Sequence, residues 1–144
     1  TACTIVDYLF NKVQGSSVDE SMRFFSDSIE YRDFNYETML KGTAEVRKFI
    51  EDFSLPGITF IAQKIDDGEL SCCFTWEIQI MDAPTTVLGI SFYEMDPEER
   101  RIVYVRDCPE SAIKPPPLAK FARDFRPGLG VFEGVPIGSR PGGK

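Results

Sequence analysis

The spacing of hydrophobic residues changes about two fifths of the way along the chain. Up to about residue 57, apolar side chains recur every three or four positions, as they do on the buried face of a helix. This spacing predicts three helices. Between the second and the third, a run in which Ile29, Tyr31 and Asp33 share one face predicts a short strand from Ile29 to Phe34. The helices are expected over Thr4 to Val13, from near Asp19 to Phe25, and from Thr43 to Phe53.

From Ile58 onward the period becomes two, which is typical of strands with one buried face. Asp66-Asp67-Gly68 predicts a hairpin between the first two runs, and Asp96-Pro97 begins the turn before the last. A meander preceded by helices predicts an α+β domain in which the helices pack on the concave face of a curved, mainly antiparallel sheet. The four runs are Ile58 to Ile65, Glu69 to Met81, Thr86 to Met95 and Ile102 to Cys108.

The run from Thr86 to Met95 alternates strictly. Leu88, Ile90 and Phe92 share one face, and Gly89, Ser91 and Tyr93 share the other, because neighbouring side chains in a strand point to opposite sides. In the preceding run an apolar face that includes Trp76 lies opposite a polar face that includes Glu77.

Composition narrows the possible functions. The 144 residues carry a net charge of −7, and no segment forms a basic stripe, so nucleic-acid binding is not expected. No apolar run approaches the roughly 20 residues of a membrane-spanning helix, so we expect membrane association only through other proteins. The first residue, Thr1, is consistent with a processed or trimmed chain.

The cysteines and the lack of histidine bear on metal and redox chemistry. No pair has the C-x-x-C spacing, so free thiols in a reducing compartment are expected. Without histidine a zinc site would need scattered thiolates and carboxylates, so neither a metal nor a cofactor is predicted. Neighbouring strand residues point to opposite faces, which argues against a redox pair at positions 72 and 73. The cysteines are Cys3, Cys72, Cys73 and Cys108.

The C-terminal part has a different character. We expect one domain over residues 1–117, a short helix over 118–126 and an extended tail over 127–144, rich in glycine and proline. Such a tail cannot build a core of its own, so it is predicted to bind a partner, the alternative being that it folds back on its own domain. The apolar residues expected to make that contact are Leu129, Val131, Phe132, Val135 and Ile137.

Three phrases carry a resemblance to a known family: FFSDSIEYRDF at 24–34, KGTAEVRKFIEDF at 41–53, and GISFYEMDPEERRIVYVRDCPESAIKP at 89–115. In this order they resemble the nuclear transport factor 2-like superfamily, also called cystatin-like or polyketide cyclase-like. The last phrase is similar to an uncharacterised plastid branch from plants and algae. The superfamily includes enzymes, ligand carriers and non-catalytic subunits on one scaffold.

The resemblance implies a conical half-barrel with a pocket between the concave sheet face and the helices. Enzymes of the superfamily commonly place an Asp there with a second acid, a His or a Tyr. Since histidine is absent, only Asp33, Glu77 or Asp107, with Tyr31 or Tyr93, could transfer a proton. The residues implied to line or gate the pocket are Tyr31, Asp33, Trp76, Tyr93, Arg106 and Asp107.

Each pocket candidate also has a purely structural interpretation. Asp33 is either a general base or a charge partner of Arg32 or Arg106. Arg106 and Asp107 either bind an anion or form a cross-strand charge pair with the first strand. Trp76 is either a ligand platform or part of the core.

Two functions remain open. The resemblance and the tail favour a non-catalytic accessory subunit in the plastid stroma, docked on a larger complex, with a photosynthetic membrane assembly as the preferred candidate. The lack of a recognisable catalytic set supports the same view. The alternative is a carrier or a cyclase- or isomerase-type enzyme that holds a small apolar molecule, with Asp33 and Tyr31 as acid and base. A homodimer through the open sheet face is compatible with either.

Overall fold

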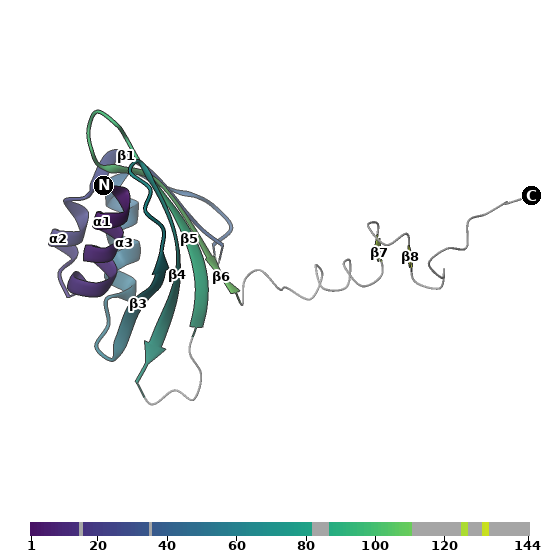
Figure 1. The fold of residues 1–144 in the computed structure, drawn as a ribbon. Helices are drawn as coiled ribbons and strands as arrows, with labels where there is room; N and C mark the ends of the chain where they lie inside the picture. Colours follow the sequence, from purple (N-terminus) through teal and green to yellow (C-terminus); the bar gives the residue numbers. More distant parts are fainter. Residues whose placement is uncertain (15, 35, 82–86, 111–124, 127–130, 133–144) are drawn as a thin grey trace, which may run out of the picture. The chain divides into compact units, whose positions relative to one another are not determined.

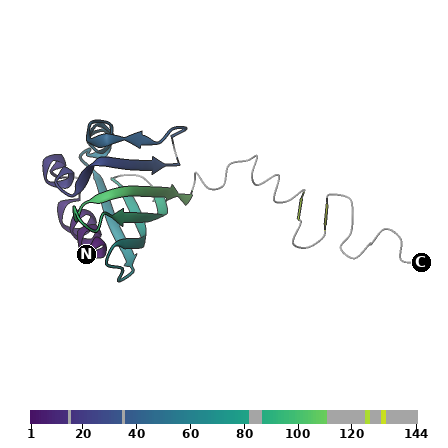
Figure 2. The same ribbon diagram turned by 90° about the horizontal axis from the view of Figure 1, so that it is seen from above.

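The chain divides into two units, Thr1–Ile113 and Lys114–Lys144, in the computed structural model. The first unit is an α+β domain in which three helices lie together on one side of a curved sheet (Figures 1 and 2). The structure describes residues 1–14, 16–34, 36–81, 87–110, 125–126 and 131–132.

The N-terminal helix has two parts. Helix α1 (Ala2–Tyr8) begins at Thr1, whose hydroxyl oxygen accepts the Thr4 backbone N–H at 3.1 Å. It continues directly into a wider π-helical turn, η1 (Leu9–Val13), which ends at Gln14 in the left-handed conformation (φ 48°). The predicted first helix is therefore confirmed, with a turn that its hydrophobic spacing did not reveal.

Helix α2 is shorter than predicted. It covers Val18–Met22, beginning close to the expected Asp19, and is capped by Ser17, whose hydroxyl oxygen accepts the Glu20 backbone N–H at 3.2 Å. Phe25, expected at the end of this helix, instead begins the first strand. Helix α3 (Gly42–Phe53) confirms the third predicted helix and buries Val46.

Six strands form the sheet of the first unit, in the order β2-β1-β6-β5-β4-β3. Neighbours are antiparallel except for β1 and β6, which run parallel, so the mainly antiparallel prediction is confirmed. The two-residue strand β2 was not predicted. The strands are β1 (Phe25–Asp33), β2 (Leu40–Lys41), β3 (Ile58–Ile65), β4 (Ser71–Ile80), β5 (Val87–Met95) and β6 (Ile102–Pro109).

The turns between strands follow the predicted chemistry. Asp96 accepts the backbone N–H groups of Glu98 and Glu99 at 2.8 Å each, which closes the β5–β6 connection. The β3–β4 hairpin is also confirmed, but its loop is longer than a two-residue turn. There the Asp66 backbone N–H donates to the Cys73 carbonyl at 3.1 Å.

The face of each strand that points to the helices contains the core. In β4 this face includes Cys72, Phe74 and Trp76, as the apolar pattern predicted. Strand β5 is arranged in the opposite sense. Its inner face carries Ser91 and Tyr93, while its more apolar face points outward and leaves Ile90 42% exposed.

The second unit contains one described element pair, β7 (Phe125–Arg126) and β8 (Val131–Phe132), which are antiparallel. Phe125 and Arg126 had been expected at the end of a short helix over 118–126, so the prediction is wrong for these two residues, because each pairs with β8. The rest of that helix and three proposed contact residues, Leu129, Val135 and Ile137, lie outside the described residues. Within the described ranges, no helix combines the length and apolar character needed to cross a bilayer.

Candidate functional site

A pocket of about 340 Å³ lies between the inner face of the sheet and the helices. This volume is within the range of about 300–1,000 Å³ that is usual for small-molecule sites. Most of its wall is apolar or aromatic and comes from η1, α3 and the strands β3 and β4. These residues include Phe10, Phe49, Phe53, Ile58, Phe60 and Ile78.

One set of hydrogen-bonded side chains at the pocket is centred on Asp107 in β6. One oxygen of its carboxylate accepts a hydrogen bond from the Tyr31 hydroxyl, and the other accepts one from the Ser91 hydroxyl. The indole N–H of Trp76 donates to the Ser91 oxygen at 2.7 Å, so the Ser91 proton is directed toward Asp107. Asp107 is thus held in one orientation by a chain of hydrogen bonds from three strands.

The register of the sheet explains why these residues meet. Tyr31 and Asp33 are two positions apart in β1 and therefore share a face, and the parallel pairing places Asp33 beside Asp107. On the other side of β6, the antiparallel pairing places Ser91 opposite Asp107. The cluster is therefore a consequence of β6 lying between β1 and β5.

Gly89 makes room for Trp76. The two residues are opposite each other in the β4–β5 pairing. A Cβ atom on Gly89 would lie 2.1 Å from the nearest atom of the indole ring, far inside van der Waals contact. The absence of a side chain at this position allows the ring to lie against the β5 backbone and reach Ser91.

The environment of Asp107 changes its acidity. Burial raises the pKa of Asp107 to about 6; the hydrogen bonds from Ser91 and Tyr31 lower the pKa, and the charge of Asp33 raises it. Burial, together with the charge of Asp107, also holds the pKa values of Tyr31 and Tyr93 well above that of a free phenol. Both tyrosines are therefore neutral hydrogen-bond donors at neutral pH, while Asp107 is close to half ionised near pH 6.

The aromatic wall opposite this cluster comes from an unusual part of the helix. Phe10 lies in the π-helical turn, and its ring centroid is 4.8 Å from that of Phe74 and 6.2 Å from that of Tyr93. Wide turns of this kind are often found at functional sites. From α3, Phe49 packs on Tyr31 with centroids 5.0 Å apart.

The structure brings five of the six predicted pocket residues together. Tyr31, Asp33, Trp76, Tyr93 and Asp107 all line the pocket. Trp76 is therefore both buried and part of the pocket wall, so its two interpretations are not exclusive.

Arg106 is the exception among the predicted pocket residues. It lies on the outer face of β6, where its guanidinium carbon is 4.7 Å from the centroid of the Phe34 ring. Arg32 lies over the same ring at 5.3 Å. The parallel register places Arg32 beside Arg106 and Asp33 beside Asp107, so directly paired residues of these two strands carry like charges.

Two contributors were not predicted. Ser91 looked like an ordinary polar residue, although its place on the same strand face as Tyr93 was a usable signal. Phe10 could not have been found, because its direction depends on the π-helical turn. Glu77, considered as a proton-transfer group, is instead hydrogen-bonded to Gln63 at 2.9 Å on the outer face.

Comparisons with known proteins identify the fold. No family model matches the chain, and no curated protein matches it. Among solved structures it is similar to a candidate ketosteroid isomerase from Kribbella flavida DSM 17836, with a TM-score of 0.65 and 17% identity over 81% of this chain and 82% of that one.

Two further structures extend this comparison. The epoxide hydrolase/cyclase-like enzyme SalBIII, with a role in pyran ring formation in the polyether salinomycin, gives a TM-score of 0.62 and 19% identity over 74% of this chain and 88% of that one. A nuclear transport factor 2-like protein of unknown function from Cytophaga hutchinsonii ATCC 33406 gives a TM-score of 0.62 and 11% identity over 83% of this chain and 95% of that one. The chain therefore has the nuclear transport factor 2-like fold, as its sequence phrases predicted.

Proposed function

We propose that the pocket binds a small, mainly apolar molecule that carries oxygen, and that Asp107 acts on it as a general base. The observation that carries this proposal is a buried carboxyl with a pKa of about 6 in the wall of an apolar pocket. General bases work best when their pKa is near the working pH. This assigns the base to Asp107, where the sequence alone favoured Asp33.

The hydrogen bonds favour the ionised form of Asp107 as the resting state. Tyr31 and Ser91 both donate to its carboxylate, and each oxygen keeps a lone pair that can accept a substrate proton. Asp107 can remove a proton from a C–H group beside a carbonyl and return it at another carbon of the enolate, which completes an isomerisation. It can also remove a proton from a hydroxyl whose oxygen attacks an epoxide carbon of the same molecule; the epoxide C–O bond breaks, and the freed oxygen takes the proton, which completes a ring closure.

The aromatic and aliphatic wall supports an apolar substrate skeleton. The nine phenylalanine and isoleucine side chains of the wall offer no hydrogen bonds, whereas Tyr31 and Asp107 form a hydrogen-bonded polar group in the same pocket. The names of similar structures agree with this chemistry, since they include an epoxide hydrolase/cyclase-like enzyme and an epoxide hydrolase from M. tuberculosis. At 16–19% identity they support the fold, and the proposal rests on the site.

Trp76 is the only tryptophan of the chain and lines the pocket, so its fluorescence can report binding. A panel of matched small molecules, comprising a cyclic ketone, an epoxide, an alcohol and the parent hydrocarbon, is titrated while the emission of Trp76 is followed. We expect saturable changes with the oxygenated members. For any member that is converted, kcat/KM should rise with pH through about 6. A panel without saturable binding, or a rate independent of pH between 5 and 7, would contradict the proposal.

A second candidate is the docked accessory subunit of a plastid complex on the stromal side. The observation that favours it is the outer face of β5, where Leu88 is 39% and Ile90 42% exposed. Exposed apolar side chains grouped on a sheet are typical of protein interfaces. The predicted partner-binding tail supports the same candidate and stays a prediction.

Co-purification from native membranes tests this second candidate. The intact chain, a truncation after Arg126 and the variant Ile90→Asp are compared, and bound partners are identified by mass spectrometry. Docking predicts that the intact chain migrates with a large complex and that both altered chains lose it. Migration of all three as a free monomer would exclude docking, and a homodimer lost only in Ile90→Asp would assign the outer face to a second copy.

A further inference from the structure

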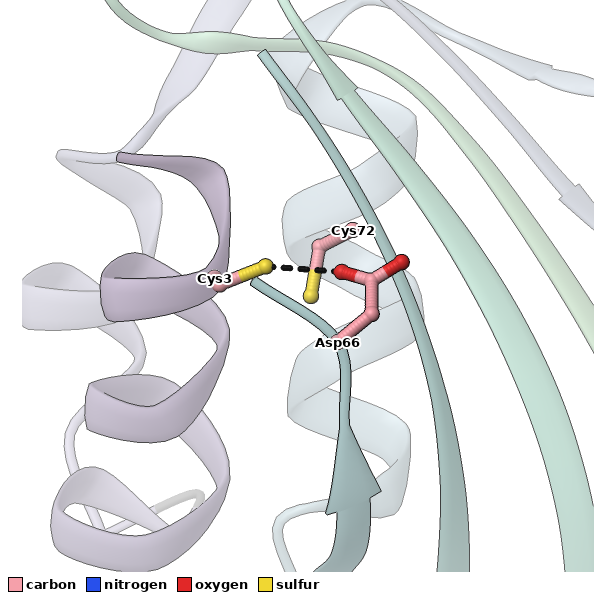
Figure 3. Close-up of side chains that lie close together, drawn as sticks. All are labelled: Cys3, Asp66 and Cys72. Atoms are coloured by element: carbon pink, nitrogen blue, oxygen red, sulfur yellow. Dashed lines mark hydrogen bonds between the residues drawn. The ribbon is translucent and has the colours of Figure 1, made fainter. Parts of the chain in front are cut away.

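Outside the pocket, three side chains that could bind a metal meet at the other end of the domain. They come from the first turn of α1, the loop after β3 and the second residue of β4 (Figure 3). The two sulfur atoms and a carboxylate oxygen all lie within 4.8 Å of one another. Among the residues that the structure describes, this is the only group of three such donors. The residues are Cys3, Asp66 and Cys72.

We propose that Cys3, Asp66 and Cys72 bind one divalent cation of intermediate softness, of which Zn²⁺ is the type. Two thiolates and a carboxylate suit such an ion, because sulfur ligands favour softer metals than the oxygen sites of Mg²⁺ or Ca²⁺. The three residues supply three of four tetrahedral positions. A water molecule or a backbone carbonyl completes the set.

The geometry requires only small movements of the three side chains. In a tetrahedral site with bonds of about 2.0–2.3 Å, neighbouring ligand atoms are roughly 3.3–3.8 Å apart. The Cys3 sulfur is now 2.9 Å from Oδ1 of Asp66, so this pair must separate slightly. Figure 3 shows both sulfur atoms and the carboxylate directed toward a common point. The Ser71 carbonyl oxygen lies 3.8 Å from the Cys3 sulfur and is the nearest candidate for a fourth ligand.

Backbone hydrogen bonds already hold the proposed ligands in place. Asp66 accepts the Cys73 backbone N–H at 2.9 Å through Oδ2, and the Gly68 backbone N–H at 3.2 Å through Oδ1. The backbone N–H of Ala2 donates to the Glu69 carbonyl at 2.7 Å, which fixes the start of α1 beside the loop. Outer contacts of this kind orient metal ligands and strengthen binding.

The three proposed ligands differ in solvent exposure, and the exposed one gives an ion access from solvent. Asp66 is exposed, Cys3 is half-buried and Cys72 is fully buried. Burial also raises the pKa of both thiols, so neither is an activated nucleophile in the metal-free protein. A bound cation would replace the thiol protons and neutralise the carboxylate.

This site was not expected from the sequence. The prediction of no metal rested on the absence of histidine and of a C-x-x-C pair. The fold brings together residues that are far apart in the sequence: Cys3 and Asp66 are 63 positions apart and are hydrogen-bonded. A cation here would join α1 to the β3–β4 loop, which gives it a structural role distinct from the pocket.

The first test is titration of the reduced, metal-free protein with Co²⁺ and then Zn²⁺. We expect one equivalent of Co²⁺ to give the absorption bands of tetrahedral cobalt–thiolate coordination, and Zn²⁺ to displace it. At a free Zn²⁺ concentration one hundred times the dissociation constant, the Tm should rise by about 10 °C. A protein that binds no equivalent of either ion, or binds Co²⁺ without a thiolate band, would overturn the proposal.

Variants distinguish Zn²⁺ binding at this site from Zn²⁺ binding by any free thiol of the chain. Cys3→Ser should weaken Zn²⁺ binding by at least about 100-fold, and Asp66→Asn by about 10-fold or more. The matched control is Cys73→Ser with Cys108→Ser, which removes the other two free cysteines and should leave binding unchanged. Circular dichroism of the metal-free variants checks that they fold. Because Asp66 is exposed, Asp66→Asn should fold, and it still tests the site if Cys3→Ser does not fold. Equal losses in the control and in Cys3→Ser would contradict the assignment.

Discussion

The inner and outer faces of the sheet differ in polarity at strands β5 and β6. On the inner face, Ser91, Tyr93 and Asp107 are polar and buried, and Asp107 is linked by hydrogen bonds to two other strands. On the outer face, Leu88 and Ile90 are apolar and exposed. In this part of β5 polarity and burial are therefore reversed relative to an ordinary half-buried sheet, whereas β6 keeps Val105 buried and Arg106 exposed. A pocket that needs polar groups inside, and an outer surface free to contact something else, account for both halves of this reversal.

The largest difference between the faces should appear in catalysis. Asp107→Asn keeps the shape of the side chain and removes its ability to accept a proton, so kcat/KM for a substrate found in the fluorescence screen should fall by about 10²–10⁴-fold. Glu77→Gln, the matched change on the outer face of β4, should leave the rate unchanged. Comparable losses in both variants would show that the inner face is not the site of proton transfer.

The second largest effect should be on how the free energy of unfolding depends on pH. The pKa of Asp107 is raised from 3.8 to about 6 on folding, so the native state holds this proton more tightly than the unfolded chain. Its stabilising contribution is complete below about pH 4 and is lost as pH rises through about 6, a change of roughly 3 kcal/mol. Asp107→Asn lacks the titrating carboxyl group, so its unfolding free energy should not contain this pH-dependent contribution. Urea unfolding of both proteins at pH 4, 5, 6 and 7 measures it, and two parallel stability curves would contradict the assignment.

Closing the space beside Trp76 should have a smaller effect. Gly89→Ala adds a Cβ atom where the indole ring now lies, so we expect a loss of about 1–3 kcal/mol in unfolding free energy and a shifted Trp76 emission spectrum. The neighbouring outer-face change Leu88→Ala should cost less than about 1 kcal/mol and leave the spectrum unchanged. An unaltered spectrum in Gly89→Ala would mean that the ring does not depend on this glycine.

The smallest effect is expected for Ile90→Thr. Threonine is also β-branched, and the side chain is 42% exposed, so the unfolding free energy of the isolated protein should change by about 0.5 kcal/mol or less. Thermal unfolding at several protein concentrations measures this. A larger loss that grows with protein concentration would show that the outer face is covered in solution, and would weaken the contrast between the faces.

The contrast also explains what could be predicted from the sequence. The period-two spacing located β3 to its first and last residues and assigned the faces of β4 correctly, because there the apolar residues are the buried ones. In β5 the same spacing is present, but residue polarity does not say which face is inside. The resemblance resolved this by naming Tyr93 as a pocket residue, and Ser91 shares the strand face of Tyr93.

The sequence predicted most residues of the candidate site, but not which strand face each one occupies or which of them are hydrogen-bonded to each other. Tyr31, Asp33 and Asp107 were singled out by residue type and by resemblance, and all three line the pocket. Arg106 was misplaced although alternation within β6 already puts Arg106 and Asp107 on opposite faces, so that only one of the two can line the pocket. The role proposed for Asp107 follows from the two hydroxyl groups that donate to its carboxylate and from its raised pKa, which are properties of the folded chain.

The parallel pairing of β1 with β6 also bears on how the protein folds. Strands β3 to β6 are joined in sequence and can pair as successive hairpins, whereas Tyr31 and Asp107 are 76 residues apart. Contacts between distant residues form late, since ordering the intervening chain costs entropy that must be offset by contacts already made. We therefore expect amide protons of β4 and β5 to become protected from exchange before those of β1 during refolding. The acid–base cluster would then be among the last parts of the domain to assemble, and partly folded chains would lack it.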